Sequence, residues 1–311
     1  MWPSHFLSFL CLALATVSTA LVAQRNTKGT PWLAIDANFP DPSFIQAPDG
    51  RWYAFGTVGN GNQVQVAVSH DFHKWALLDD DGKYVMYYSG EAQIDAPHHC
   101  VGVAVSESTD PAGPYIPNLV PLACPLDQGG AIDPSGFRDT DGSRYVLYKV
   151  DGNSAGHGGD CNNGVEPLVG TPIKLQQVGP DGFTPIGEAV TILDRSTADN
   201  DGPLVEAPNL VLGSDGTYYL FYSTHCFTDP LYDVRYATAK SVHGPYVKSD
   251  GDDQVLLQGG KVGDGLELTN PGGATVCGCG DRMLFHGFCR DGVRCMYAAD
   301  VEIGGGRVKI L

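Results

Sequence analysis

Basic residues are scarce in this chain. It has 19 Lys and Arg residues against 36 Asp and Glu residues among 311, which gives a formal net charge of −17. A surface of that sign repels the phosphates of nucleic acids and of anionic membranes. The composition therefore argues against both as partners and suits a protein that acts on neutral ligands.

Long apolar runs are also missing, except near the N-terminus. Residues 6–15 are largely apolar and are followed by Ser18-Thr19-Ala20, a small-residue pattern typical of signal-peptide cleavage. A membrane anchor is the less favoured alternative, because the run is shorter than a bilayer span and no other stretch could cross. We expect residues 1–23 to be a signal peptide and residues 24–311 to form one secreted, extracellular domain.

The cysteines indicate disulfides. Cys11 lies in the predicted signal peptide, which leaves eight others: Cys100, Cys124, Cys161, Cys226, Cys277, Cys279, Cys289 and Cys295. An even number in a secreted chain predicts up to four disulfides, although eight cysteines leave the pairing open. The last four could instead hold zinc, but an oxidising compartment favours disulfides.

One structural unit recurs along the chain. The sequence has 40 Gly, 21 Pro and only 18% charged residues, which favours turns and strands over helices. A turn that enters an aromatic, β-prone strand is found five times, at residues 49–55, 81–88, 141–148, 215–222 and 281–286. Five sequential antiparallel sheets predict an all-β, five-bladed β-propeller. A two-sheet sandwich is the alternative, but the fivefold recurrence favours the propeller.

The spacing of the repeats exposes a gap. Successive turns start 32, 60, 74 and 66 residues apart, so the first interval is short by about one strand and its connection. Between Trp75 and Asp81 only five residues remain. We therefore expect the second blade to lack its innermost strand, through a gene-model error or in a genuine variant. Sequencing the transcript across codons 75 to 81 distinguishes the two, and the gene-model error is the explanation we favour.

Three inner-strand segments carry a carboxylate: Asp41, Asp133 and Glu206. Inner strands line the central channel of a propeller, so these side chains are expected to converge. Hydrolysis of a glycosidic bond needs one protonated carboxyl and one ionised carboxylate, and a third acid nearby raises the pKa of the proton donor. A single Asp before Pro more often only caps a turn. Three such acids favour the catalytic interpretation.

The same segments resemble glycoside hydrolase family 43, in particular its secreted fungal members of the arabinanase, arabinofuranosidase and β-xylosidase type. The resemblance rests on residues 38–43, 131–137, 205–210 and 271–275, in this order. It implies that Asp41 is the general base, that Asp133 tunes and orients the acid, and that Glu206 is the general acid of an inverting reaction. Family members normally carry a Trp-Ala-Pro-Asp type segment on the second blade. This chain lacks it at the place where the repeats show the gap.

Further site residues are expected around these acids. His286 resembles the family histidine near the channel axis, which in some members helps to hold calcium through water; a structural histidine is the alternative. Phe39, Phe137, Asn209 and His225 are candidates for binding the sugar, although core packing explains aromatic residues equally well. No cofactor is required for hydrolysis, and calcium would have a structural role only.

We therefore predict a monomeric, inverting glycosidase that acts on arabinan, arabinoxylan or xylan oligosaccharides. The first alternative is a propeller that binds glycans without cleaving them, since the second blade is incomplete. A second alternative is an invertase-like fructoside hydrolase, which needs an Arg-Asp-Pro type segment. Only Arg138-Asp139-Thr140 approaches that pattern.

Overall fold

The computed structural model describes residues 30–60, 64–77, 84–92, 98–107, 111, 113–262 and 265–311. The predicted signal peptide lies outside these residues. The described residues form 23 strands and four short 3-10 helices: η1 (Leu126–Gln128), η2 (Gly152–Ala155), η3 (Asp160–Asn162) and η4 (Gly251–Asp253). Among them there is no helix long and apolar enough to span a membrane.

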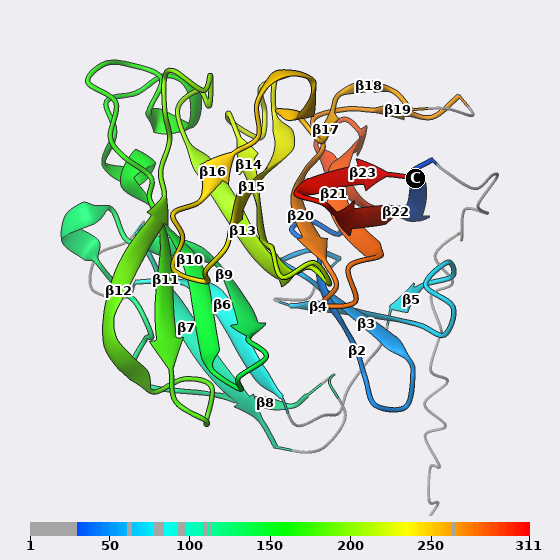
Figure 1. Cartoon of the computed structure of the whole chain (residues 1–311), viewed down its shortest axis with the longest axis horizontal. Helices are drawn as coiled ribbons and strands as arrows, with labels where there is room; N and C mark the ends of the chain where they lie inside the picture. The colour runs from blue at the N-terminus through cyan, green and yellow to red at the C-terminus, as the bar shows by residue number, and fades with distance from the viewer. Residues whose placement is uncertain are drawn as a thin grey trace, which may run out of the picture.

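The predicted five-bladed β-propeller is confirmed, with five antiparallel sheets that follow one another around the molecule (Figure 1). The first blade contains β2 (Ser43–Gln46), β3 (Trp52–Gly56), β4 (Gln65–Ser69) and β5 (Ala76–Leu77). The third contains β9 (Ala131–Arg138), β10 (Arg144–Val150), β11 (Ile173–Val178) and β12 (Pro185–Leu193). The fourth contains β13 (Val205–Leu212), β14 (Tyr218–Thr224), β15 (Asp233–Ala239) and β16 (Val247–Lys248), with β17 (Leu257–Gln258) also paired to β15.

The fifth blade is completed by the first strand of the chain. It contains β20 (Gly272–Val276), β21 (Arg282–Arg290), β22 (Val293–Gly304) and β1 (Trp32–Ile35), with β23 (Arg307–Ile310) also paired to β22. Because β1 comes from the N-terminal side and β20 to β22 from the C-terminal side, their pairing closes the ring. A separate hairpin of β18 (Gly260–Lys261) and β19 (Glu267–Leu268) precedes this blade.

The second blade has three strands in the described part of the chain: β6 (Val85–Glu91), β7 (His99–Ser106) and β8 (Tyr115–Pro117). Its first strand, β6, is the aromatic strand of the repeated unit, which is the second strand in the other blades. β6 lies against β9, the innermost strand of the third blade. The prediction that this blade lacks the usual innermost strand is therefore confirmed for the residues that the structure describes.

The repeated Asp-Gly turn has the same local structure in three blades. The carboxylate of Asp49 accepts a hydrogen bond from the backbone N–H two residues later, at 3.0 Å, and Asp141 and Asp215 do the same at 2.8 and 3.0 Å. The following glycine has φ between 72° and 89° in each, which other residues rarely adopt. This turn chemistry leads each chain segment into a paired β-strand.

Hydrophobic clusters join neighbouring blades, but not equally. Clusters of 16, 12 and 13 buried residues join blades four and five, three and four, and five and one. The cluster between blades two and three has only four buried residues: Val101, Ala131, Tyr148 and Val150. In the described residues no such cluster joins blades one and two. The second blade is therefore the least supported by apolar packing.

All eight expected cysteines form disulfides, which pair Cys100 with Cys124, Cys161 with Cys226, Cys277 with Cys279 and Cys289 with Cys295. The four cysteines considered for zinc are therefore bonded to one another. A disulfide sulfur is not the thiolate that zinc requires, so the disulfide prediction is confirmed and the zinc alternative was wrong.

Candidate active site

The inner strands of four blades share an unusual backbone position. Asp41, Asp133, Ala207 and Gly273 have φ of 53°, 56°, 52° and 58°. The strand pairing of β9, β13 and β20 is shifted at this position, which indicates a local bulge. Two of the predicted acids, Asp41 and Asp133, occupy the position itself. Glu206 lies one residue before it, so the three acids are not at identical places in their blades.

Asp41 is held by positive and hydrogen-bonding groups from the first and fifth blades. Its carboxylate lies 3.1 Å from Nη1 of Arg294 and 3.2 Å from Nδ1 of His286, and it accepts a hydrogen bond from Oγ1 of Thr57 at 2.9 Å. Burial alone would raise the pKa of Asp41, but the hydrogen bond and charge of His286 and the charge of Arg294 lower that pKa well below its ordinary value. Asp41 is therefore ionised at any pH near neutrality.

Asp133 has the opposite electrostatic environment. Burial and the negative charge of Glu206 raise the pKa of Asp133 to about 7, and the charge of Lys149 only partly offsets them. The Asp133 carboxylate accepts a hydrogen bond from the backbone N–H of Ala207 at 2.9 Å, next to Glu206 in the chain. Its own N–H donates to Oγ of Ser89 in β6, at 3.0 Å. Asp133 therefore holds its proton to a much higher pH than an ordinary aspartate does.

Glu206 is oriented from both sides. One carboxylate oxygen lies 3.3 Å from Nζ of Lys149 in β10, and the other accepts a hydrogen bond from the Tyr232 hydroxyl at 2.9 Å. Only 15% of the Glu206 side chain is exposed. Lys149 and Tyr232 were not predicted from the sequence. A single Lys within the buried run of β10 was the signal that could have identified the first.

Two adjacent rings connect the surroundings of Glu206 and Asp41. The Tyr232 ring stacks on the His286 ring, with centroids 5.9 Å apart and planes at 11°. The Tyr232 hydroxyl donates a hydrogen bond to Glu206, and Nδ1 of His286 lies 3.2 Å from the Asp41 carboxylate. The structure thus brings the three predicted acids and His286 into one connected site.

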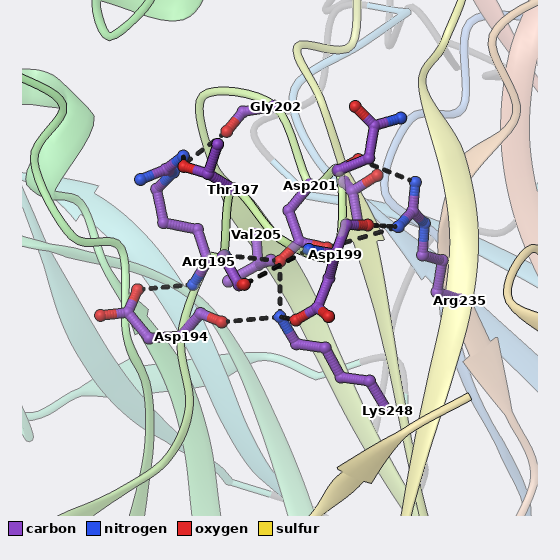
Figure 2. Close-up of polar contacts among 12 residues, drawn as sticks. Asp194, Arg195, Thr197, Asp199, Asp201, Gly202, Val205, Arg235 and Lys248 are labelled. Atoms are coloured by element: carbon purple, nitrogen blue, oxygen red, sulfur yellow. Dashed lines mark hydrogen bonds and ion pairs between the residues drawn. The ribbon is translucent and has the colours of Figure 1, made fainter. Parts of the chain in front are cut away.

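The segment that leads into Glu206 is fixed by an ion cluster, which we define as Asp199, Asp201, Asp233, Arg235 and Lys248. Figure 2 labels four of these residues, Asp199, Asp201, Arg235 and Lys248. Asp201 is fully buried and forms ion pairs with Arg235 and Lys248. Arg235 also donates to the backbone carbonyls of Asp199 and Asn200, at 2.8 and 3.1 Å. These bonds hold the segment before β13 against the fourth blade. The position of Glu206 therefore depends on charges that do not touch it.

The four predicted sugar-binding residues contact side chains and backbone groups other than the three acids. Phe39 is fully buried in the cluster between blades five and one, and Phe137 packs on Tyr145 and Tyr218. Asn209 accepts a hydrogen bond from the N–H of Val276 at 2.9 Å and so links two blades. His225 is buried and bonds Thr224, and burial lowers its pKa.

A calcium ion on the axis would meet few ligands in the described part of the chain. Nε2 of His286 is buried there without a hydrogen-bond partner, which leaves one ring nitrogen for water or an ion. Calcium prefers six to eight oxygen ligands. The described groups of three close donor residues all contain disulfide cysteines and do not include His286. The calcium ion held by His286 through water stays a prediction, and no chemical step is assigned to it.

The sequence of this chain is similar to those of known proteins. A family model described as Glycosyl hydrolases family 43 matches residues 76–290. The chain is 24% identical to an extracellular endo-alpha-(1->5)-L-arabinanase 2 of Bacillus subtilis, over 82% of this chain and 58% of that protein. It is 30% identical to a xylosidase/arabinosidase of Bacteroides ovatus, over 64% of each. It thus spans less than two thirds of both relatives.

The fold also matches a solved structure. A thermostable family-43 glycoside hydrolase superimposes with a TM-score of 0.71 at 22% sequence identity, and the match covers 91% of this chain and 96% of that one. At this level of identity the likeness concerns the fold.

Proposed function

Because the chain belongs to glycosyl hydrolase family 43, we propose that it is a secreted, monomeric glycosidase that hydrolyses arabinose- or xylose-containing polysaccharides with inversion. The names of the two relatives, an arabinanase and a xylosidase/arabinosidase, support these substrates, and the extracellular relative supports secretion. Linear arabinan is the first substrate to test.

The observation that carries the proposal is the opposite electrostatic tuning of the acids. Asp41 is kept ionised by His286 and Arg294, whereas burial and the negative charge of Glu206 raise the pKa of Asp133, beside the proposed acid, to about 7. General base and general acid catalysis need these two states at the same pH.

In the proposed reaction, Asp41 takes a proton from a water molecule as the water oxygen bonds to the anomeric carbon. Glu206 gives its proton to the leaving glycosidic oxygen as the bond between that oxygen and the anomeric carbon breaks. The products are an inverted sugar and a free hydroxyl, and no redox cofactor takes part. Asp133 stays beside Glu206, and in this proposal its role is to orient the acid and to favour the protonated form by like-charge repulsion.

The test replaces Glu206 by Gln and compares two substrates. Glu206→Gln should abolish release of sugar from arabinan, because the leaving hydroxyl then receives no proton. It should keep far more activity on an aryl arabinofuranoside with an acidic phenol, which leaves without one. Circular dichroism checks the fold, and NMR of the first product reports its anomer. Undiminished hydrolysis of arabinan would remove Glu206 as the acid, and a retained anomer would remove the inverting mechanism.

A propeller that binds glycans without cleaving them is the second candidate, favoured by the three-stranded second blade. Binding of arabino-oligosaccharides without release of reducing sugar would support it. The invertase-like alternative has less support, since Asp139 lies in the turn between β9 and β10, where it accepts a hydrogen bond from the Tyr218 hydroxyl at 2.7 Å.

A further inference from the structure

Lys149 is the only charged side chain in the buried part of its strand. It belongs to β10, where the six residues from Tyr145 to Val150 are all buried, and only 1% of its side chain is exposed. A buried ammonium group is stable only where it is paired and hydrogen-bonded. The strand therefore places one positive charge inside the propeller at a fixed point.

The charges around Lys149 come from three directions. Its Nζ lies 3.1 Å from Oδ1 of Asp151, at the end of the same strand, and 3.3 Å from Oε2 of Glu206 in β13. Asp133, in β9, acts on it through its negative charge. Burial would lower the pKa of Lys149, but the charges of Glu206, Asp151 and Asp133 raise it, so the ammonium stays protonated.

This half of the site is thus distinct from the half around Asp41. Arg294 forms an ion pair with Asp41, and Nδ1 of His286 accepts a hydrogen bond from the Asp41 backbone N–H at 3.1 Å, whereas three carboxyl groups share Lys149. Tyr232 also faces Glu206, but as a neutral hydrogen-bond donor. The negative charge of Asp41 adds to the repulsion on Asp133. Lys149 is the one ammonium or guanidinium group that the described residues place against Asp133 and Glu206.

We propose that Lys149 is a positioning residue for the proposed acid, because its ammonium group orients the Glu206 carboxyl and balances the negative charge of Glu206 and Asp133. This inference rests on the proposed function for its catalytic meaning. The pH at which the carboxyl groups beside Lys149 lose their protons is a property of the protein alone and can be measured without substrate.

The charge balance gives opposite predictions for the two ends of the ion pair. Lys149→Met removes the positive charge, so the carboxyl groups of Asp133 and Glu206 should ionise less readily. The alkaline limb of the profile of kcat/KM against pH should therefore move up by about one to two pH units. Asp151→Asn removes a negative charge instead, and the same limb should move down. The double variant Lys149→Met and Asp151→Asn restores the net charge, and its limb should return toward that of the wild type.

Two controls separate this role from a structural one. Lys174→Met removes a lysine from the neighbouring strand β11, where its Nζ donates to Thr191 at 2.8 Å, and should leave the limb unchanged. Lys149→Arg retains the charge and should keep the limb near its wild-type position, even if kcat falls. A structural role alone would lower kcat or stability in the Lys149 variants without moving the limb in opposite directions.

The decisive measurement is a carboxyl 13C NMR titration of the same proteins, which needs no substrate. We expect one Asp or Glu carboxyl that titrates near neutral pH in the wild type, at a higher pH in Lys149→Met and at a lower pH in Asp151→Asn. Unchanged titration in both variants would overturn the role of Lys149. If the wild type shows this titration but hydrolyses no glycan, the proposed function is overturned. If the wild type hydrolyses glycans but the titration is the same in both variants, only this inference is overturned.

Discussion

Gly272 leaves the space in which the Tyr232 ring lies. A Cβ atom at Gly272 would overlap Cε1 and Cζ of that ring, and one at the next residue, Gly273, would lie 2.8 Å from the ring of His286. The Pro271-Gly272-Gly273 segment of β20 is thus explained by the two stacked rings that connect the proposed acid and base. Glycine is required at both positions because the rings approach the backbone closely, and at Gly273 also because φ is positive.

Gly272→Ala should displace Tyr232 and impair the site. An added methyl group in packed surroundings costs about 1–3 kcal/mol of folding free energy, and here the displaced ring also loses its bond to Glu206. We expect a lower melting temperature and a drop in kcat/KM on arabinan. Gly278→Ala is the matched control, because a Cβ there meets no atom within 4 Å. Equal activity of the two variants would contradict the role of Gly272.

Tyr232→Phe should lower kcat while keeping the ring stack. The change removes only the hydroxyl that donates to Glu206, and a hydrogen bond between neutral groups contributes about 0.5–1.5 kcal/mol, so a fall of about two- to tenfold is expected. Tyr219→Phe removes another buried tyrosine hydroxyl, bonded to Asp215 at 3.1 Å, and should leave kcat unchanged. Steady-state kinetics of both variants decides whether the Glu206 contact matters.

Asp133→Asn should stabilise the protein at neutral and alkaline pH while it lowers activity. The pKa of Asp133 is raised on folding from 3.8 to about 7, so its favourable contribution is complete below the lower value and is lost as the pH rises through the higher one. Asn carries no charge and can still accept the hydrogen bond from Ala207. The variant should therefore gain on the order of 2 kcal/mol in unfolding free energy at pH 8 and little at pH 4. Urea unfolding at both pH values measures this, and a gain at pH 4 alone would contradict it.

The second blade should open before the others. It is joined to the third blade by a cluster of four buried residues, whereas the other clusters have 12 or more. Local stability follows buried apolar contacts, so backbone amides of β6 and β7 should exchange with deuterium sooner than those of β14 and β21. Hydrogen exchange with mass spectrometry tests this order, and equal protection in all blades would contradict it.

Much of the fold and part of the site could be predicted from the sequence. The Asp-Gly turns and aromatic strands recur at measurable intervals, and Asp41, Asp133 and Glu206 lie in inner segments that those intervals locate. Lys149, Tyr232 and Arg294 could not be identified in this way, because they lie on or beside the second and third strands of their blades, where most residues serve packing. Their contact with the acids depends on how one blade sits against the next, and that arrangement is three-dimensional.

Asp41 and Asp133 combine a carboxylate that we propose acts in catalysis with a left-handed backbone position, and this limits which mutations a descendant of the chain could accumulate. Left-handed backbone is readily adopted only by Gly, Asn and Asp. Replacement by Glu would conserve the charge but strain the main chain, whereas Asn or Gly would remove the charge and suit the main chain. A lineage that lost hydrolysis while keeping the propeller would therefore be expected to carry Asn or Gly at these two positions.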